Sequence, residues 1–218
     1  MTIALLTLLH ILIPVYWLGG DLGAFYGSSF MVDPKRTVPE RMLALKILND
    51  IDMAPRTALI LALPTGFTLA ATKGWLAVSP LLVALVWVVA LVWLALAWAV
   101  HLSHGGGSSW TRPTDLAIRY VVIVGTFGTA IASLAGLIDI PLFIALKLIA
   151  LGICICLGLF IRMLLAPLGP AIVSMKTDGP SPQSDAAIAG VISRTRPAVL
   201  AIWVAVLAAS YFGIAMPL

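Results

Sequence analysis

The chain has 218 residues, of which 61% are hydrophobic and only 10% are charged. With a mean hydropathy of +1.11, this composition excludes an ordinary soluble domain and indicates a protein that is embedded in a membrane. The net charge of +4 does not indicate nucleic-acid binding, because the basic residues are dispersed over three loops without aromatic side chains beside them for base stacking.

Six apolar runs along the chain are long enough to cross a bilayer. A helix needs about 20 residues to cross a hydrocarbon core of about 30 Å, and runs this continuous are typical of helices and not of barrel strands. We therefore predict an all-α bundle of about six transmembrane helices that forms one domain, residues 1–218. The predicted spans are residues 3–30, 54–72, 78–102, 116–138, 140–166 and 197–215.

The distribution of basic residues predicts the orientation of this bundle. Eleven of the 13 Lys and Arg residues lie in or beside the loops after the first, third and fifth spans. Because positive charge is retained on the cytoplasmic side during insertion, both termini should lie outside, in a multi-pass protein of a bacterial-type inner membrane. These basic residues are Lys35, Arg36, Arg41, Lys46, Arg56, Arg112, Arg119, Arg162, Lys176, Arg194 and Arg196.

Three segments are irregular or polar. Residues 39–48 alternate apolar and charged side chains, which predicts a short helix lying at the inner membrane interface, with a gating or partner-docking segment as the alternative. Residues 169–196 contain Gly179, Pro180 and Pro182, so we expect a turn-rich, mobile loop there. Pro64 predicts a kink in the second span.

Polar residues on two of the predicted spans identify the candidate site. Placing an ionisable group inside a membrane costs free energy, so such groups are candidates for a functional role. His10, Trp17 and Asp21 share one face of the first span, and Lys147 and Arg162 share one face of the fifth. At a rise of about 1.5 Å per residue, His10 and Lys147 lie at the same depth. If the two faces meet, His10 and Lys147 form an outer site.

Each residue of this outer site has a predicted role. His10 is the candidate ligand for a haem iron or another transition metal, and a histidine that is hydrogen-bonded inside the bundle is the alternative. Lys147 would contact a haem propionate or the sixth coordination position, for which Met216 is the other candidate. Trp17 shares the face of His10 and is predicted to contact the cofactor. Lys147 and Asp21 are the candidate catalytic residues.

For Asp21, structural pairing is the interpretation that we place ahead of direct catalysis. We expect its carboxylate to neutralise one of the arginines near the inner boundary, and so to fix the register of the helices. The candidate partners are Arg56, Arg119 and Arg162.

Other polar and aromatic residues give weaker signals. His101 and His104, at the inner end of the third span, would hold a divalent metal only with help from Asp115 or Asp21, and solvated histidines are the alternative. Cys154 and Cys156 point about 200° apart on a helix, so they do not form a disulfide or grip one metal together. The tryptophans of the third span are expected to face lipid by default, and lining a large flat ligand is the alternative; they are Trp87, Trp93 and Trp98.

Residues 9–20, with the sequence LHILIPVYWLGG, place a first-span histidine before an aromatic residue and a Gly-Gly pair, and DMAPR at 52–56 leads to PTG at 64–66. These motifs resemble the superfamily that includes CopD-type copper-resistance membrane proteins and HemJ-type protoporphyrinogen oxidases. The resemblance covers roughly the first hundred residues and implies a helical bundle with His10 at the position of a haem ligand. HemJ-like proteins also use a lysine after the second span, for which Lys147 would substitute here, and they have four spans.

These observations predict a b-type haem-associated membrane redox protein, in which His10 is the axial ligand and a quinone or a protein is the redox partner. Such a protein would act as a haem-dependent oxidoreductase. A transporter or accessory factor for a metal ion such as copper, or for a small solute, is the first alternative. The second alternative is a membrane-anchor subunit of a larger complex, and a homo-oligomer is compatible with each function.

Overall fold

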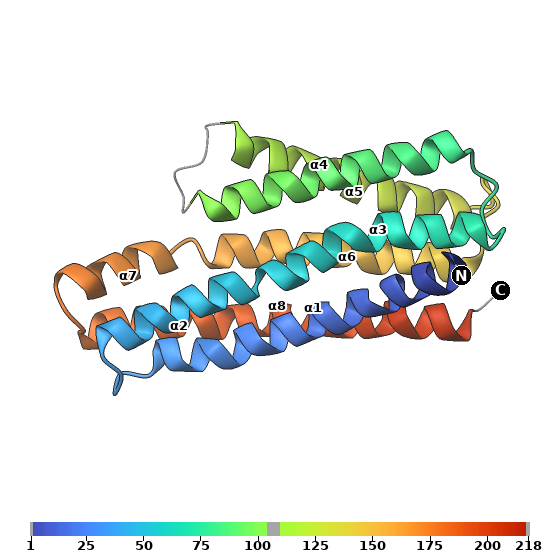
Figure 1. The fold of residues 1–218 in the computed structure, drawn as a ribbon. Coiled ribbons are helices and arrows are strands. Elements are labelled where there is room, and N and C mark those ends of the chain that lie inside the picture. Colours follow the sequence, from blue (N-terminus) through green and yellow to red (C-terminus); the bar gives the residue numbers. More distant parts are fainter. Residues whose placement is uncertain (1, 104–109, 217–218) are drawn as a thin grey trace.

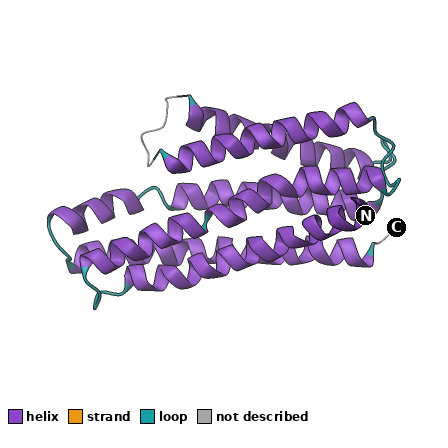
Figure 2. Ribbon diagram, viewed as in Figure 1, coloured by secondary structure: helices purple, strands orange, loops and turns teal. Residues whose placement is uncertain are grey.

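The computed structural model describes residues 2–103 and 110–216, and this part of the chain is helical with short connecting turns (Figures 1 and 2). The predicted all-α class is therefore confirmed for the described residues. The helices are α1 (Thr2–Val32), α2 (Val38–Ile51), α3 (Met53–Thr72), α4 (Pro80–Leu102), α5 (Thr111–Leu134), α6 (Leu142–Leu164), α7 (Leu168–Thr177) and α8 (Pro182–Ala215).

Several helices have the length and composition of membrane spans, so the chain is a polytopic helical membrane protein. In the described part of the chain, α3 does not reach the same mean hydropathy, because Arg56, two prolines and several threonines lower it. It nevertheless packs beside α1 and α4 along the bundle. The five stretches that meet the criteria are Ile3–Val32, Pro80–Leu102, Thr111–Leu134, Leu142–Thr177 and Pro182–Ala215.

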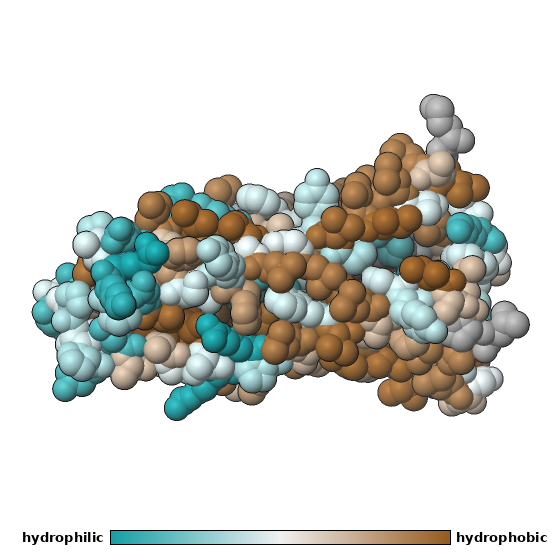
Figure 3. Space-filling model, turned by 90° about the horizontal axis from the view of Figure 1, so that it is seen from below, coloured by the Kyte–Doolittle hydropathy of each residue, from teal (hydrophilic) through white to brown (hydrophobic). Residues whose placement is uncertain are grey.

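Six helices form a closed ring. α1 packs against α3 and α8, α8 against α6, α6 against α5, α5 against α4, and α4 against α3. The start of α1 and the end of α8 lie at the same end of the bundle, which we call the terminal end; α2 and α7 lie at the opposite end, the polar end (Figure 1). Hydrophilic side chains gather at the polar end, whereas apolar side chains cover much of the remaining length (Figure 3).

The centre of the ring is filled by an apolar core. It contains Trp17 from α1, Ile60 from α3, Trp93 from α4, Ile155 from α6 and Ile202 from α8, all of them buried. Burying apolar side chains from five ring helices in one cluster fixes the positions of these helices relative to one another.

The polar end has a second, smaller core. Met31, Met175, Ile188 and Ile192 are its buried members, and they join α1, α7 and α8. The helix predicted at residues 39–48 is present as α2, but it continues the line of α3 and packs along α1 (Figure 1). The interfacial placement is wrong because the apolar side of α2, including Met42, is packed against this second core.

The prediction of a mobile loop over residues 169–196 is also wrong. Residues Leu168–Thr177 form α7, and α8 begins at Pro182, well before the predicted start at residue 197. The Ser181 hydroxyl accepts a hydrogen bond from the Ser184 backbone N–H, and Pro182 lies in the first turn; both are strong helix-start signals. Gly179, with a φ of 86°, makes the turn between the two helices, where glycine is favoured.

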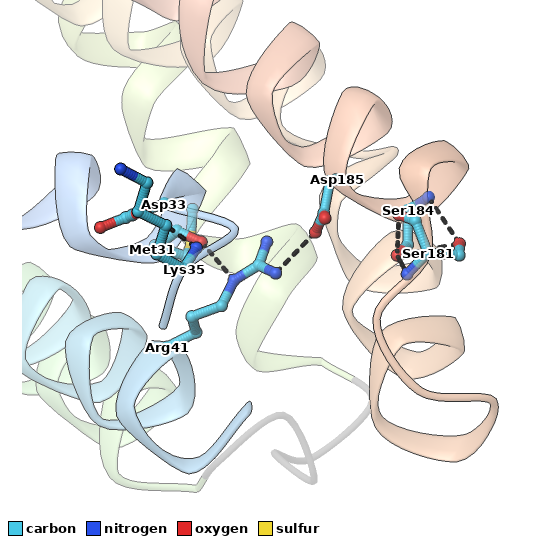
Figure 4. A network of polar contacts seen from close by, with 7 residues as sticks. All are labelled: Met31, Asp33, Lys35, Arg41, Ser181, Ser184 and Asp185. Atoms are coloured by element: carbon cyan, nitrogen blue, oxygen red, sulfur yellow. Dashed lines mark hydrogen bonds and ion pairs between the residues drawn. The ribbon is translucent and has the colours of Figure 1, made fainter. Parts of the chain in front are cut away.

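A buried arginine, Arg41, links α1, α2 and α8 at the polar end (Figure 4). Arg41 is completely buried. Its Nε donates a hydrogen bond to the Met31 carbonyl at 2.7 Å, and its Nη1 donates to the Asp185 carboxylate at 2.6 Å. Because a buried charge is tolerated only when it is paired and hydrogen-bonded, this contact sets how α2 sits against α8.

Candidate functional site

A cavity of about 690 Å³ lies inside the ring, on the terminal side of the apolar core. All six ring helices contribute to its mostly apolar walls, and Lys73, Trp75 and Met216 line it at the terminal end. Trp17 and Cys154 form part of its deep end. The volume falls within the range of about 300–1,000 Å³ that is typical of small-molecule sites.

His10 and Lys147, which the sequence placed at equal depth, contact each other in the wall of this cavity. The Nζ atom of Lys147 lies 3.3 Å from Nε2 of His10, and both residues line the cavity. Their helices, α1 and α6, run in the same direction (Figure 1). The polar faces of the two helices therefore meet at His10 and Lys147, as the sequence suggested.

Thr65 is the hydrogen-bond partner of His10 on α3. The Thr65 hydroxyl donates its single proton to the Leu61 carbonyl at 2.7 Å, so its oxygen acts as the acceptor for His10 Nδ1 at 2.9 Å. In the tautomer that fits this geometry, His10 is protonated on Nδ1 and its Nε2 presents a lone pair to Lys147 and the cavity. Metal-ligating histidines have the same arrangement, in which the second ring nitrogen donates to a protein acceptor.

Two glycines make room for this pair. A Cβ atom on Gly66 of α3 would lie 2.9 Å from Cε1 of His10, and a Cβ atom on Gly213 of α8 would lie 3.0 Å from Nζ of Lys147. Both distances are shorter than ordinary van der Waals contact. The backbone of α3 therefore lies directly against the imidazole, and the backbone of α8 lies directly against the ammonium.

Lys147 has no carboxylate partner among the residues that the structure describes, and its polar contact is His10. Removing an ammonium group from water costs free energy unless an opposite charge or hydrogen bonds compensate. The cavity consequently favours a ligand that brings an anionic group to Lys147 while its remaining surface is apolar.

The predicted ion pairs of Asp21 are absent from the described structure. Its buried Oδ2 atom has no hydrogen-bond partner there, although the carboxylate lies beside the indole groups of Trp17 and Trp203. Arg56, which we expected to pair with Asp21, pairs with Asp52 instead. Asp52 is four residues before Arg56 on the same stretch of chain, and this spacing brings the two side chains together locally.

The other two arginines converge on Asp115, whose role the sequence reasoning missed. Arg119 donates to its carboxylate at 3.0 and 3.2 Å, Arg162 donates at 3.1 Å, and the buried Trp93 indole donates at 3.0 Å. Trp93 therefore faces the interior and not lipid. The available signal was the four-residue spacing of Asp115 and Arg119, which places both on one face of a helix.

His101 is remote from His10, at the polar end of α4, where its Nε2 atom lies 3.4 Å from the Asp50 carboxylate. His104 lies outside the described residues. Within the described residues, no group of three or more His, Cys, Asp or Glu side chains is placed to hold a metal ion. Cys154 is buried and Cys156 is exposed, as expected for thiols on opposite sides of a helix.

A scan of family models, a search of curated proteins and a search of solved structures each found no match. The resemblance to the CopD and HemJ superfamily therefore stays a prediction, carried by His10 and the residues that follow it.

Proposed function

We propose that this chain is a membrane redox protein that binds haem b in the cavity of the helix ring, with His10 as the axial ligand. The observation that supports the proposal most directly is the position of His10, which lines a cavity of about 690 Å³ with its Nδ1 held 2.9 Å from the Thr65 hydroxyl. Haem, when bound, would supply one-electron redox chemistry.

The other residues of the cavity fit this ligand. Lys147 would receive an anionic group of the ligand, because its flexible stem would let the ammonium move from His10 to a propionate. As the neutral amine, it would instead serve as a second ligand to the iron. Trp17 supplies a flat apolar wall, and Met216 lines the cavity at the terminal end. Lys147, beside the ligand, would donate a proton from Nζ to a ligand group bound in the cavity and would become the neutral amine. Asp21, whose Oδ2 is unpartnered among the described residues, would accept one on the polar side of Trp17.

The proposal includes the arrangement of the chain in the membrane. We infer that α3 is the sixth span, because it completes the ring between α1 and α4. The polar end would face the cytoplasm, as its basic residues favour, and both termini would lie outside. A quinone in the bilayer or a protein at either surface would exchange electrons with the site.

The test is an ultraviolet–visible spectrum of the detergent-purified protein, oxidised and then reduced with dithionite, after expression with ample haem. We expect a stoichiometric Soret band with sharp α and β bands on reduction. His10→Ala should lose these bands, whereas His101→Ala, which changes a histidine at the polar end, should retain them. A folded His10→Ala protein with full haem content would contradict the assignment of the ligand.

A transporter for a metal ion such as copper, or for a small solute, is the second candidate. The observation in its favour is the architecture, in which a ring of helices surrounds a cavity that reaches the terminal end and is closed on the other side by the apolar core. It predicts solute flux into proteoliposomes that depends on Asp21 and Lys147. Unchanged flux in both Asp21→Asn and Lys147→Gln would count against it.

A further inference from the structure

A cluster of arginines on the polar side of the apolar core carries more positive charge than its carboxylate neutralises. Asp115 is the acceptor for both Arg119 and Arg162, at 3.0 and 3.1 Å. One carboxylate thus faces two guanidinium groups, which leaves one positive charge in excess at this position.

The excess charge is accessible on Arg162. The Arg119 side chain is only 9% exposed and stacks against the Trp93 ring, 5.5 Å from its centroid, so it belongs to the interior. The Arg162 side chain is 47% exposed and, among the described residues, hydrogen-bonds to Asp115 through one terminal nitrogen. Its other donors remain available to a ligand.

Arg56 adds a second accessible guanidinium to the same region. It lies in the first turn of α3, its side chain is 44% exposed, and it contacts the partly exposed Asp52. Thr57, next to Arg56, accepts a hydrogen bond from Trp98 of α4, and the Asp115 carboxylate that binds Arg162 accepts one from Trp93 of the same helix, so both arginines lie beside α4. Since α3 begins at Met53 and α6 ends at Leu164, both arginines lie where the apolar helices give way to the polar end. This is the level at which lipid headgroups are expected.

We infer that Arg56 and Arg162 together bind the phosphate group of an anionic membrane lipid in the leaflet at the polar end. Guanidinium groups match the geometry of phosphate oxygens and donate paired, charge-assisted hydrogen bonds to them. Basic pockets between transmembrane helices recognise acidic headgroups in this manner. The site is separate from the cavity, because Arg162 lies 15 residues beyond Lys147 on α6, about 22 Å along the helix.

The experiment is a lipid titration of the delipidated full-length protein, with bound molecules counted by native mass spectrometry. Phosphatidylglycerol is compared with phosphatidylcholine, and inorganic phosphate is titrated in a parallel series. The variants are Arg56→Gln, Arg162→Gln and the control Arg194→Gln, which removes the same charge from an exposed position in the polar half of α8. Arg56→Gln leaves the Asp115 contacts intact, so it keeps the test informative if Arg162→Gln fails to fold.

We expect one phosphatidylglycerol to bind in preference to phosphatidylcholine. A basic residue near a lipid surface contributes about 1 kcal/mol, so each of Arg56→Gln and Arg162→Gln should weaken this binding about fivefold, while Arg194→Gln should not change it. If Arg194→Gln weakened phosphatidylglycerol binding equally, diffuse surface charge and not a specific site would attract the lipid. This result would overturn the proposal. Binding of inorganic phosphate as tight as that of the lipid would also overturn the proposal, because it would make this a free-anion site.

Discussion

Among single residues, Asp115 is the carboxylate on which the arginine cluster depends. Asp115→Asn would leave the buried Arg119 without its counter-charge, and breaking such a buried pair costs about 3–5 kcal/mol. The half-exposed Arg162 should add little to this loss. We expect a marked fall in the unfolding temperature of the detergent-solubilised protein, followed by tryptophan fluorescence.

The matched control for Asp115 is Asp139→Asn, which changes an exposed carboxylate. Surface substitutions of this kind usually alter stability by less than about 0.5 kcal/mol. If both variants unfolded at the temperature of the unmodified protein, Asp115 would not hold the cluster together.

Gly66 is the residue that decides how closely His10 approaches α3. Gly66→Ala would place a Cβ atom 2.9 Å from the imidazole, so His10 would have to move away from Thr65 and Lys147. Overpacking of this kind costs about 1–3 kcal/mol, and we expect haem affinity to fall about tenfold or more. The measurement is haem retained per protein after gel filtration.

Gly128→Ala is the control for Gly66, because nothing lies within 4 Å of a Cβ atom built at that position. Both substitutions gain similar helix propensity, about 1 kcal/mol, so a difference between them reports on crowding at His10. Equal haem retention in the two variants would show that the contact with Gly66 does not position the ligand.

Among the helices, those with long apolar runs were predicted from the sequence. Those whose apolar residues are buried only by packing against a neighbouring helix were missed. The predicted start and end of α3 and α4 lie within two residues of those observed, because continuous apolar runs are interrupted by Lys73 and by Pro80. In contrast, α7 and the first half of α8 mix polar with apolar residues, and Met175, Ile188 and Ile192 are buried there because they meet α1 and α2 in the second core.

The same distinction applies to the candidate site. The depth of His10 and Lys147 follows from the rise of a helix, so their equal depth was predictable from the sequence, whereas their contact also depends on the faces of α1 and α6 meeting. The hydrogen bond from His10 to Thr65 was not, because it depends on how α3 is rotated against α1. The partners of Asp21 were predicted wrongly, because carboxylates nearer in the chain pair with Arg56 and Arg119.

The start of α2 should respond to pH through its capping box. The Thr37 backbone N–H and hydroxyl both donate to Glu40, and the backbone contact is the largest cause that lowers the Glu40 pKa below its ordinary 4.5. A carboxyl whose pKa is lower in the folded state contributes stability above its unfolded pKa, and this contribution is lost as the pH falls through the folded pKa.

We therefore expect amide protection in the first turn of α2 to decrease as the pH falls below 4.5. The measurement is hydrogen exchange, with protection corrected for the intrinsic effect of pH on exchange. Glu40→Gln should show less protection near neutral pH and no such transition. A transition of the same size in Glu40→Gln would assign it to another group.

In the whole molecule, the two ends of the ring differ in charge as well as in shape. The terminal side holds an apolar cavity lined by two ammonium groups, those of Lys73 and Lys147, that lack a carboxylate partner among the described residues, whereas the polar side holds paired arginines and a second core. A ligand that reaches the cavity from the terminal end does not have to cross the apolar core. The orientation of the chain therefore decides from which compartment the cavity is reached.

Cysteine accessibility tests that orientation. In a Cys154→Ala, Cys156→Ala background, Lys73→Cys places one thiol at the terminal end and Lys176→Cys places one on α7; both positions are exposed. Because the basic residues favour a cytoplasmic polar end, a membrane-impermeant maleimide applied to intact cells should label Lys73→Cys and leave Lys176→Cys unmodified until the membrane is opened. The reverse labelling pattern would mean that the cavity opens to the cytoplasm and that Arg56 and Arg162 lie at the outer leaflet. Labelling of both thiols in sealed cells would mean that the chain inserts in two orientations.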